Sequence, residues 1–359
     1  MDLINTIINL VVGKVCLRLG NENACVLAGK MSHLEDIILT VMYIITMLVS
    51  LLGNILQLYI VWKKPDVRSL TSFMFVNMAV ADLLITLVVI PYTVSDSFTQ
   101  GVWPMSGLIG QITCKAVIYV AFFTISASIL CLTFMAVDRF YAVVYPFRRL
   151  LWFRKPKVLT PIVWLLSMAF MSIVPVYVIL QSYPENSEHM CVTNFTILGD
   201  KSKAIRGVFI YFFVINYLLP VSIISVLYAI TVRRLWYHEA PGEDLGQNRE
   251  RQQQTKRKVV RMLIIVFTAF ALCWLPGQVF QLYLAVTAKN LPIVAAACYW
   301  FGYNHSAINP WLYISLNRRM YNAFLRMTFK KLQLAKRDLK TDEEEMTPTP
   351  TNVSQETRL

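Results

Sequence analysis

Long apolar runs, separated by short polar segments, dominate the chain. About 20 consecutive, largely apolar residues are enough to cross the hydrocarbon core of a bilayer as an α-helix. Seven runs of this kind lie at 36–62, 71–97, 111–144, 158–180, 205–236, 258–286 and 292–316. The seventh is the weakest because Asn304, His305 and Asn309 lie within it, and polar side chains in lipid must turn towards the protein interior. The pattern predicts an all-α membrane protein with a seven-helix transmembrane domain at 36–316.

The segment after the seventh run has a different pattern. Residues 317–334 place Tyr321, Phe324, Leu325, Phe329 and Leu332 on one helical face and arginines and lysines on the other. We therefore expect an amphipathic eighth helix that lies on the membrane surface and contacts lipid. Residues 335–359 are charged and rich in Thr and Pro, so this segment is predicted to be a disordered tail.

Composition supports the membrane assignment. The chain is 56% hydrophobic and 15% charged, with a mean hydropathy of +0.52, whereas soluble domains are about 25% charged. The net charge of +13 could indicate a nucleic-acid partner, but the basic residues gather in short segments between apolar runs. That placement is typical of cytoplasmic loops, so we expect no nucleic-acid partner.

The same loops predict the orientation. Basic residues follow the first, third, fifth and seventh runs, whereas the alternate loops are mixed or acidic. The positive-inside rule then predicts a multi-pass protein whose residues 1–35 form an extracellular N-terminus and whose C-terminus is cytoplasmic.

Short motifs occur in order, each in its own run. They are Gly53-Asn54, Ala81-Asp82-Leu83, Asp138-Arg139-Phe140, Trp164, Pro220 with Tyr228, Cys273-Trp274-Leu275-Pro276 and Asn309-Pro310-Trp311-Leu312-Tyr313. Each alone is weak, but together they resemble the rhodopsin-like (class A) G-protein-coupled receptors over nearly the whole chain. The resemblance implies a receptor of the plasma membrane rather than an enzyme, and neither GxSxG nor HExxH occurs.

The resemblance implies a site that couples to a heterotrimeric G protein, with arrestin as a further partner. Its residues are Asp138, Arg139, Tyr228, Asn309, Pro310 and Tyr313. Asp138 is expected to hold Arg139 in the resting state; the alternative is an arginine that merely reaches the headgroups. Many relatives carry an acid at the foot of the sixth helix that also holds this arginine. Here Lys256-Arg257-Lys258 stand there, so this second restraint is expected to be absent.

A packing switch is implied in the middle of the bundle by Ile129, Pro220, Phe270, Trp274 and Pro276. Prolines inside helices remove backbone hydrogen bonds and allow bending. The alternative is that the two aromatic residues belong simply to the core.

Asp82 is a carboxylate inside a predicted span, where a charge is costly and needs a partner. The resemblance brings Asn54, Ser128, His305, Ser306 and Asn309 towards it and implies a site for an allosteric sodium ion. His305 replaces the commoner asparagine, which is expected to weaken or reshape the site. The alternative is a protonated, hydrogen-bonded carboxyl. No spacing typical of a transition-metal site occurs, and no other cofactor is expected.

The ligand pocket is expected at Tyr92, Asp96, Ala121, Phe122, Gln278, Gln281, Tyr299, Trp300 and Tyr303. Tyr303 stands where a retinal protein has its lysine, and Ala121 where amine receptors have an aspartate. The pocket resembles those of neuropeptide receptors of the RFamide and tachykinin-like groups. We expect a secreted peptide with a basic residue near an aromatic or amidated end. A non-peptide ligand, or an ion-coupled transporter, is the alternative.

Covalent features complete the expectations. The resemblance implies a disulfide between Cys114 and Cys191, whereas Cys16 and Cys25 could pair or stay free. Asn194-Phe195-Thr196 is a glycosylation sequon in an outer loop. Thr357 and Leu359 end the chain in a form that resembles a ligand of PDZ-domain proteins; the alternative is an ordinary disordered end.

Overall fold

A computed structural model describes residues 33–99, 101–145, 155–183, 188–237, 247–287 and 292–328. Several predicted features lie outside the described residues. These are the pairing of Cys16 and Cys25, most of the predicted N-terminal segment, the positions of Phe329 and Leu332, the tail, and its ending at Thr357 and Leu359.

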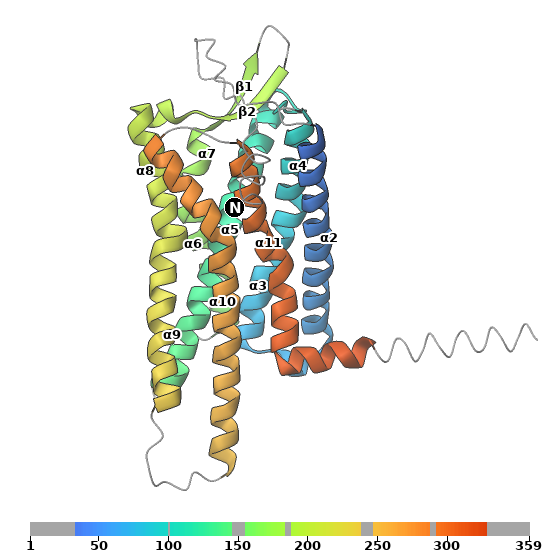
Figure 1. The fold of residues 1–359 in the computed structure, drawn as a ribbon, viewed down its shortest axis with the longest axis vertical. Coiled ribbons are helices and arrows are strands. Elements are labelled where there is room, and N and C mark those ends of the chain that lie inside the picture. The colour runs from blue at the N-terminus through green and yellow to red at the C-terminus, as the bar shows by residue number, and fades with distance from the viewer. Residues whose placement is uncertain are drawn as a thin grey trace, which may run out of the picture.

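Seven rods of helix run along one common axis (Figure 1). Several rods consist of more than one element, because a π-helical turn or a short break interrupts the α-helix. In chain order the rods are α2 (His33–Lys63); α3 (Leu70–Leu84) with η2 (Ile85–Val89) and α4 (Ile90–Thr99); α5 (Gly107–Val144); α6 (Pro156–Phe170) with α7 (Val174–Tyr177); α8 (Lys201–Phe213) with η4 (Val214–Leu218) and α9 (Leu219–Tyr237); α10 (Gln247–Thr287); and α11 (Pro292–Leu316). Two short 3₁₀ turns, η1 (Pro65–Val67) and η3 (Phe195–Leu198), lie between rods.

The apolar runs predicted these rods closely. Among the described helices, six are long and apolar enough to cross a membrane. The seventh rod, α11, has the predicted bounds of 292–316, but the polar residues noted in the sequence keep it outside that group. The fourth run was predicted to stay helical to residue 180. That part of the prediction is wrong, because the helix ends at Tyr177 and Val178 begins a strand.

Two π-helical turns interrupt the rods. η2 ends two residues before Pro91, and η4 ends two residues before Pro220. A proline has no N–H to donate to the preceding turn, and its ring crowds the carbonyl there. A widened turn accommodates that ring, and such turns occur frequently at functional sites.

A β-hairpin covers one end of the bundle (Figure 1), which we call the hairpin end. It pairs β1 (Val178–Tyr183) with β2 (Glu188–Thr193) in antiparallel register. Cys191 of β2 forms a disulfide with Cys114 near the start of α5, which confirms the predicted bridge. Val102 adds an isolated bridge to Met190, so three segments meet over this end. The sequence did not predict the hairpin.

The last helical segment, residues 318–328, lies across the opposite end of the bundle (Figure 1, red). We call this the Arg139 end. The Asn317 side chain accepts hydrogen bonds from the backbone nitrogens of Arg319 and Met320, which caps the new helix. Met320 and Ala323 are buried against the bundle, whereas Tyr321 is 44% exposed. The helix is therefore confirmed over 318–328, but Tyr321 does not belong to the face that packs against the bundle.

The outside of the bundle is apolar. Leu52 and Leu272 are each 63% exposed, and Val286 is 76% exposed. Contiguous apolar surface of this kind is rare on soluble proteins and marks contact with lipid or a partner. The polar side chains described next lie on the inside instead.

Candidate functional site

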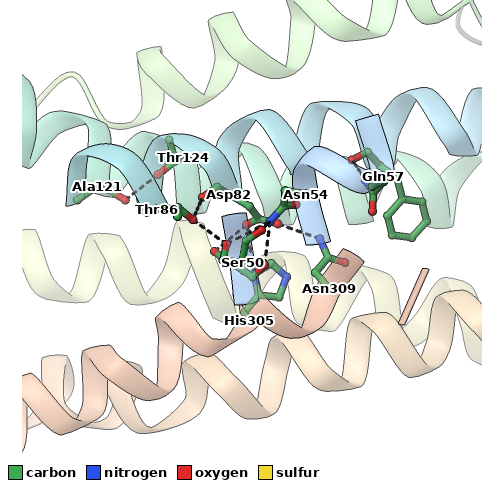
Figure 2. A network of polar contacts seen from close by, with 11 residues as sticks. Ser50, Asn54, Gln57, Asp82, Thr86, Ala121, Thr124, His305 and Asn309 are labelled. Atoms are coloured by element: carbon green, nitrogen blue, oxygen red, sulfur yellow. Dashed lines mark hydrogen bonds and ion pairs between the residues drawn. The ribbon is translucent and has the colours of Figure 1, made fainter. Parts of the chain in front are cut away.

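A fully buried carboxylate, Asp82 of α3, forms the centre of a polar cluster with three residues of α11 (Figure 2). Ser306 Oγ donates a 2.8 Å hydrogen bond to Asp82 Oδ1, and Asn309 Nδ2 donates one of 3.1 Å to Oδ2. His305 Nδ1 is 3.8 Å from Oδ1, which is too long for a hydrogen bond. We call these four residues the Asp82 cluster.

Asn54 of α2 supports the cluster without touching the carboxylate. Its Nδ2 donates to the backbone carbonyls of Ser50 and Ser306, at 2.9 and 3.0 Å. Ser50 Oγ is 2.6 Å from Thr86 Oγ1, and Thr86 donates to the Asp82 backbone carbonyl. Ser50 and Thr86 were not predicted, because hydroxyls in apolar helices often bond only to their own preceding turn.

Several buried oxygens in this region have no hydrogen-bond partner within the described part of the chain. They are Asn54 Oδ1, Ser128 Oγ and Asn309 Oδ1. Ser128 is 1% exposed, and among the described residues its Oγ forms no hydrogen bond, to Asp82 or to any other. Buried polar atoms are normally satisfied, and oxygens beside a carboxylate are ligands that hard cations prefer. The residues present therefore fit the predicted cation. The described residues contain no group of three His, Cys, Asp or Glu suited to a transition metal.

At the Arg139 end, the guanidinium turns towards α3. Arg139 Nη2 is 2.6 Å from Asp138 Oδ2, and the same nitrogen donates a 3.1 Å hydrogen bond to Thr71 Oγ1. Asp138 is 2% exposed and the Arg139 side chain 21%, so the pair is largely shielded from the surroundings. Arg139 is thus held between its own helix and α3.

The two tyrosines predicted for the G-protein coupling site, Tyr313 and Tyr228, lie in different surroundings. Tyr313 is fully buried, stacks on Phe75 with ring centroids 3.8 Å apart, and its hydroxyl is 2.9 Å from Ser72 Oγ. Tyr228 is also buried, but its hydroxyl forms no hydrogen bond to a described residue. It lies close enough to Arg139 to interact with it electrostatically. The hydroxyl of Tyr228 is therefore free to accept a new partner.

One of the basic residues in the first half of α10, Arg257, joins α9 to α10. Arg257 Nε and Nη2 both donate to the Leu235 carbonyl, at 3.1 and 2.8 Å. The guanidinium also lies 5.4 Å from the centre of the Trp236 ring. A cation is favourable in the last turn of a helix, so Arg257 stabilises the end of α9.

The switch residues lie in the middle of the bundle. Ile129, Phe270 and Trp274 belong to one buried cluster, and the rings of Phe270 and Trp274 are 6.4 Å apart. Trp274 packs so closely on Gly302 of α11 that a Cβ there would lie 2.7 Å from its ring. Pro276 lies inside α10, and buried Pro220 follows η4.

Towards the hairpin end, tyrosines and glutamines gather above Trp274. The Tyr303 ring lies edge-on to Trp274 at 6.1 Å, and its hydroxyl interacts with Thr93. Tyr299 interacts with Gln281. Gln278 and Gln281 are 4% and 5% exposed, and neither Oε1 atom has a hydrogen-bond partner among the described residues. These oxygens can accept hydrogen bonds from a ligand.

The other residues predicted for the ligand pocket do not all lie beside these tyrosines and glutamines. Asp96 is exposed and its carboxylate interacts with Tyr92, one turn earlier in α4. Phe122 packs on Phe212 of α8, and Ala121 is half-buried. Trp300 does not join this group. Its Nε1 donates to Thr46 Oγ1 of α2, and it lines a groove of about 570 Å³ between α2 and α11.

Two tyrosines that were not predicted from the sequence lie near the predicted ones. Tyr43 of α2 lies 6.2 Å from the Tyr303 ring and donates to the Ala296 carbonyl. Tyr177 lies near Tyr299 and stacks on Phe195. Neither carries a motif. The only sequence signal is an aromatic residue with a polar tip near the outer end of an apolar run.

Comparison with known proteins shows which family the chain belongs to. Residues 53–313 match the family described as "7 transmembrane receptor (rhodopsin family)". The chain belongs to that family. It is 31% identical to the allatostatin-A receptor of Bombyx mori over 79% of this chain and 77% of that protein. Identity to the RYamide receptor of Tribolium castaneum is 25%, over 80% and 79%. Identity to the substance-P receptor of Aquarana catesbeiana is 29%, over 79% and 69%.

Because the chain belongs to the rhodopsin family, it is a multi-pass membrane protein whose seventh span is α11.

The hairpin of this receptor is attached to the bundle. The disulfide holds β2 to α5, and Gln111 Oε1 of α5 accepts a hydrogen bond from Leu180 N. Asn194, in the predicted sequon, accepts hydrogen bonds from Thr196 N and Oγ1 and caps η3. The hairpin is therefore fixed to the bundle at several points.

Proposed function

We propose that this receptor, in the plasma membrane, binds a secreted peptide at the hairpin end and activates a heterotrimeric G protein at the Arg139 end. The loop charges support an extracellular hairpin end and a cytoplasmic Arg139 end. The observation that carries the proposal is a series of contacts that runs from the hairpin end to the middle of the bundle. Tyr303, Trp274, Phe270, His305 and Asp82 follow one another from the hairpin end inward.

The names of the relatives support a peptide ligand, since those proteins are receptors for allatostatin-A, RYamide and substance P. The chemistry at the hairpin end agrees. The Asp96 carboxylate can bind the planar fork of an arginine. Gln278 and Gln281 each offer a buried oxygen that can accept an N–H of a terminal carboxamide. Tyr299 and Tyr303 offer aromatic surface. The ligand is therefore a peptide with a basic residue next to an aromatic, amidated end.

At the proposed cytoplasmic end, two sets of contacts support a resting receptor. Arg139 is held by Asp138 and Thr71, and Tyr313 by Ser72. Binding of a G protein requires Arg139 to leave these partners, and the free hydroxyl of Tyr228 can then accept a hydrogen bond from it. Bending at Pro276 and Pro310 lets α10 and α11 move during this change. Arrestin would bind the same end.

A sodium ion would be held by Asp82 with oxygens of Ser128, Asn54 and Asn309. It supplies a positive charge beside a carboxylate that is costly to bury alone. Three further proposals concern the periphery. The helix at 318–328 lies on the inner leaflet, Asn194 carries a glycan, and the chain end at Thr357 and Leu359 binds a PDZ domain.

The ligand proposal is tested with peptides that end in Arg-Phe-amide and Arg-Tyr-amide, each beside its citrulline and free-acid counterparts. Citrulline keeps the shape of arginine but removes its charge. Asp96→Ala should weaken the arginine peptides about tenfold, equivalent to about 1.4 kcal/mol, and the citrulline peptides much less. Ser97→Ala, an exposed neighbour in α4, is the control and should change neither. Equal losses for arginine and citrulline peptides would show that Asp96 does not bind the ligand's charge.

A further inference from the structure

A groove runs along the outside of the bundle between α2 and α11, which lie side by side (Figure 1). Its volume of about 570 Å³ lies within the range of about 300–1,000 Å³ that is typical of sites for small molecules. Its walls include Met42, Ile45 and Val49 of α2 and Ile308 and Leu312 of α11. We call it the α2–α11 groove.

Close contacts between the two helices keep the shape of this groove. Trp300 Nε1 donates a 3.1 Å hydrogen bond to Thr46 Oγ1, which in turn lies 3.4 Å from Asn304 Oδ1. Further along, Gly53 brings α2 so near α11 that a Cβ there would lie 2.8 Å from Trp311 Nε1. The groove is therefore formed by side chains that are already packed against one another.

The lining of the groove is suited to hydrocarbon. Its side chains Ile45, Val49 and Ile308 are apolar and exposed. Its polar side chains already form hydrogen bonds within the protein. Asn304 Nδ2 donates to a backbone carbonyl one turn earlier, and Ser315 Oγ donates to one three residues earlier. A ligand in the groove therefore gains contacts with apolar side chains and few new hydrogen bonds.

At the Arg139 end, the helical segment 318–328 borders the groove and adds positive charge (Figure 1, red). Tyr321 and Phe324 of this segment line the groove. Arg318 lies three residues before Tyr321, and residues with this spacing are neighbours on a helix surface. Arg318 is exposed and forms no salt bridge with a described residue, and no acidic residue occurs between positions 317 and 334. An apolar groove that ends beside an unpaired cation matches the acyl chain and charged headgroup of an anionic lipid.

We propose that the α2–α11 groove binds one anionic phospholipid, with an acyl chain along the groove and the headgroup beside Arg318. Moving a chain from the bilayer into an apolar groove gains little hydrophobic free energy, because both surroundings are apolar. The groove therefore fixes the position of the lipid, and the headgroup charge decides which lipid is held. That this lipid belongs to the inner leaflet rests on the proposed cytoplasmic position of the Arg139 end, whereas the binding itself does not.

The test is native mass spectrometry of purified receptor in detergent, titrated with phosphatidylserine, phosphatidylcholine or cholesterol. It yields the apparent dissociation constant of the first bound lipid and needs no G protein. Val49→Trp fills the groove, and Leu52→Trp is its control, because Leu52 is exposed on the same helix but does not line the groove. Arg318→Gln removes the charge. Arg326→Gln is its control, since Arg326 is also exposed but lies well round the helix from Tyr321.

Phosphatidylserine should bind about fivefold more tightly than phosphatidylcholine, because a basic residue near anionic lipid contributes about 1 kcal/mol. Arg318→Gln should remove most of this preference. Val49→Trp should weaken both phospholipids about fivefold or more, and Ile308→Trp, which fills the groove from α11, should do the same. The two controls should change neither lipid, and thermal unfolding midpoints show that each variant is folded.

Three results would overturn the proposal. The first is equal binding by Val49→Trp and Leu52→Trp, and the second is a preference for phosphatidylserine that survives Arg318→Gln. The third is cholesterol that binds more tightly than phosphatidylserine and is lost in Val49→Trp, which would assign the groove to a sterol. If the lipid binds as expected but no G protein responds to the receptor, the lipid site stands and the proposed function fails.

Discussion

Replacing Gly302 with alanine places a methyl group against the ring of Trp274. The added Cβ would lie 2.7, 2.8 and 3.0 Å from three ring carbons. Carbon atoms pack at about 3.5–4.0 Å, so the indole must move by nearly 1 Å. Gly277 provides a matched control. It is also buried and helical, and the nearest Trp274 atom to its Cβ is at 3.9 Å, an ordinary contact.

The expected magnitude follows from this difference. Overpacking a close contact costs about 1–3 kcal/mol. Both substitutions gain a similar helix propensity, about 1 kcal/mol, which cancels between them. The cost falls on the conformation in which Trp274 lies against Gly302 and Arg139 is held by Asp138. Gly302→Ala should therefore shift the population towards the active state by about 5- to 150-fold relative to Gly277→Ala.

The assay is basal nucleotide exchange by receptor in lipid nanodiscs, at equal amounts of folded receptor. Gly302→Ala should exchange at least fivefold faster than Gly277→Ala without any peptide. Equal basal rates for the two variants would show that the position of Trp274 does not set the balance between states.

The disulfide and the Asp82 cluster can each be tested by a single substitution. Cys114→Ser should reduce both surface delivery and peptide binding, because a disulfide that closes a long loop contributes about 2–4 kcal/mol and here holds the hairpin over the bundle. Cys298→Ser should not, and mass spectrometry that finds Cys114 and Cys191 as free thiols would contradict the bridge. NaCl should raise the thermal midpoint above that in KCl at equal ionic strength, and Asp82→Asn should remove the difference. A difference that persists in Asp82→Asn would place the sodium effect elsewhere.

The helices could be predicted because each is an apolar run longer than a bilayer requires, with polar residues at its ends. α11 could be identified despite its polar residues because Asn309-Pro310 belongs to a motif. The hairpin could not be predicted in this way. Its two strands of six residues have no strong alternation, and tertiary pairing and the Cys114–Cys191 bridge hold them in place. The π-helical turns have no periodicity of their own that a sequence can show.

The sequence predicted which residues form the site better than it predicted which way their side chains point. Asp82, Ser306 and Asn309 meet as expected, since a buried carboxylate must find polar partners. Trp300 lies against α2 instead of among the ligand residues, because an apolar helix does not reveal by composition which side faces lipid. Asn54 acts through Ser50 and Thr86, whose roles depend on a helix-to-helix contact that no local pattern contains.

Peptide binding at the hairpin end is expected to drive nucleotide exchange at the Arg139 end. The direct measurement uses purified receptor in nanodiscs with a panel of G-protein heterotrimers and the amidated peptides ending in Arg-Phe or Arg-Tyr. At least one heterotrimer should exchange nucleotide faster with receptor and peptide than with receptor alone. Arg139→Ala should remove this gain while peptide binding remains. Exchange no faster than with empty nanodiscs for every heterotrimer, or a gain that survives Arg139→Ala, would contradict this coupling between the two ends.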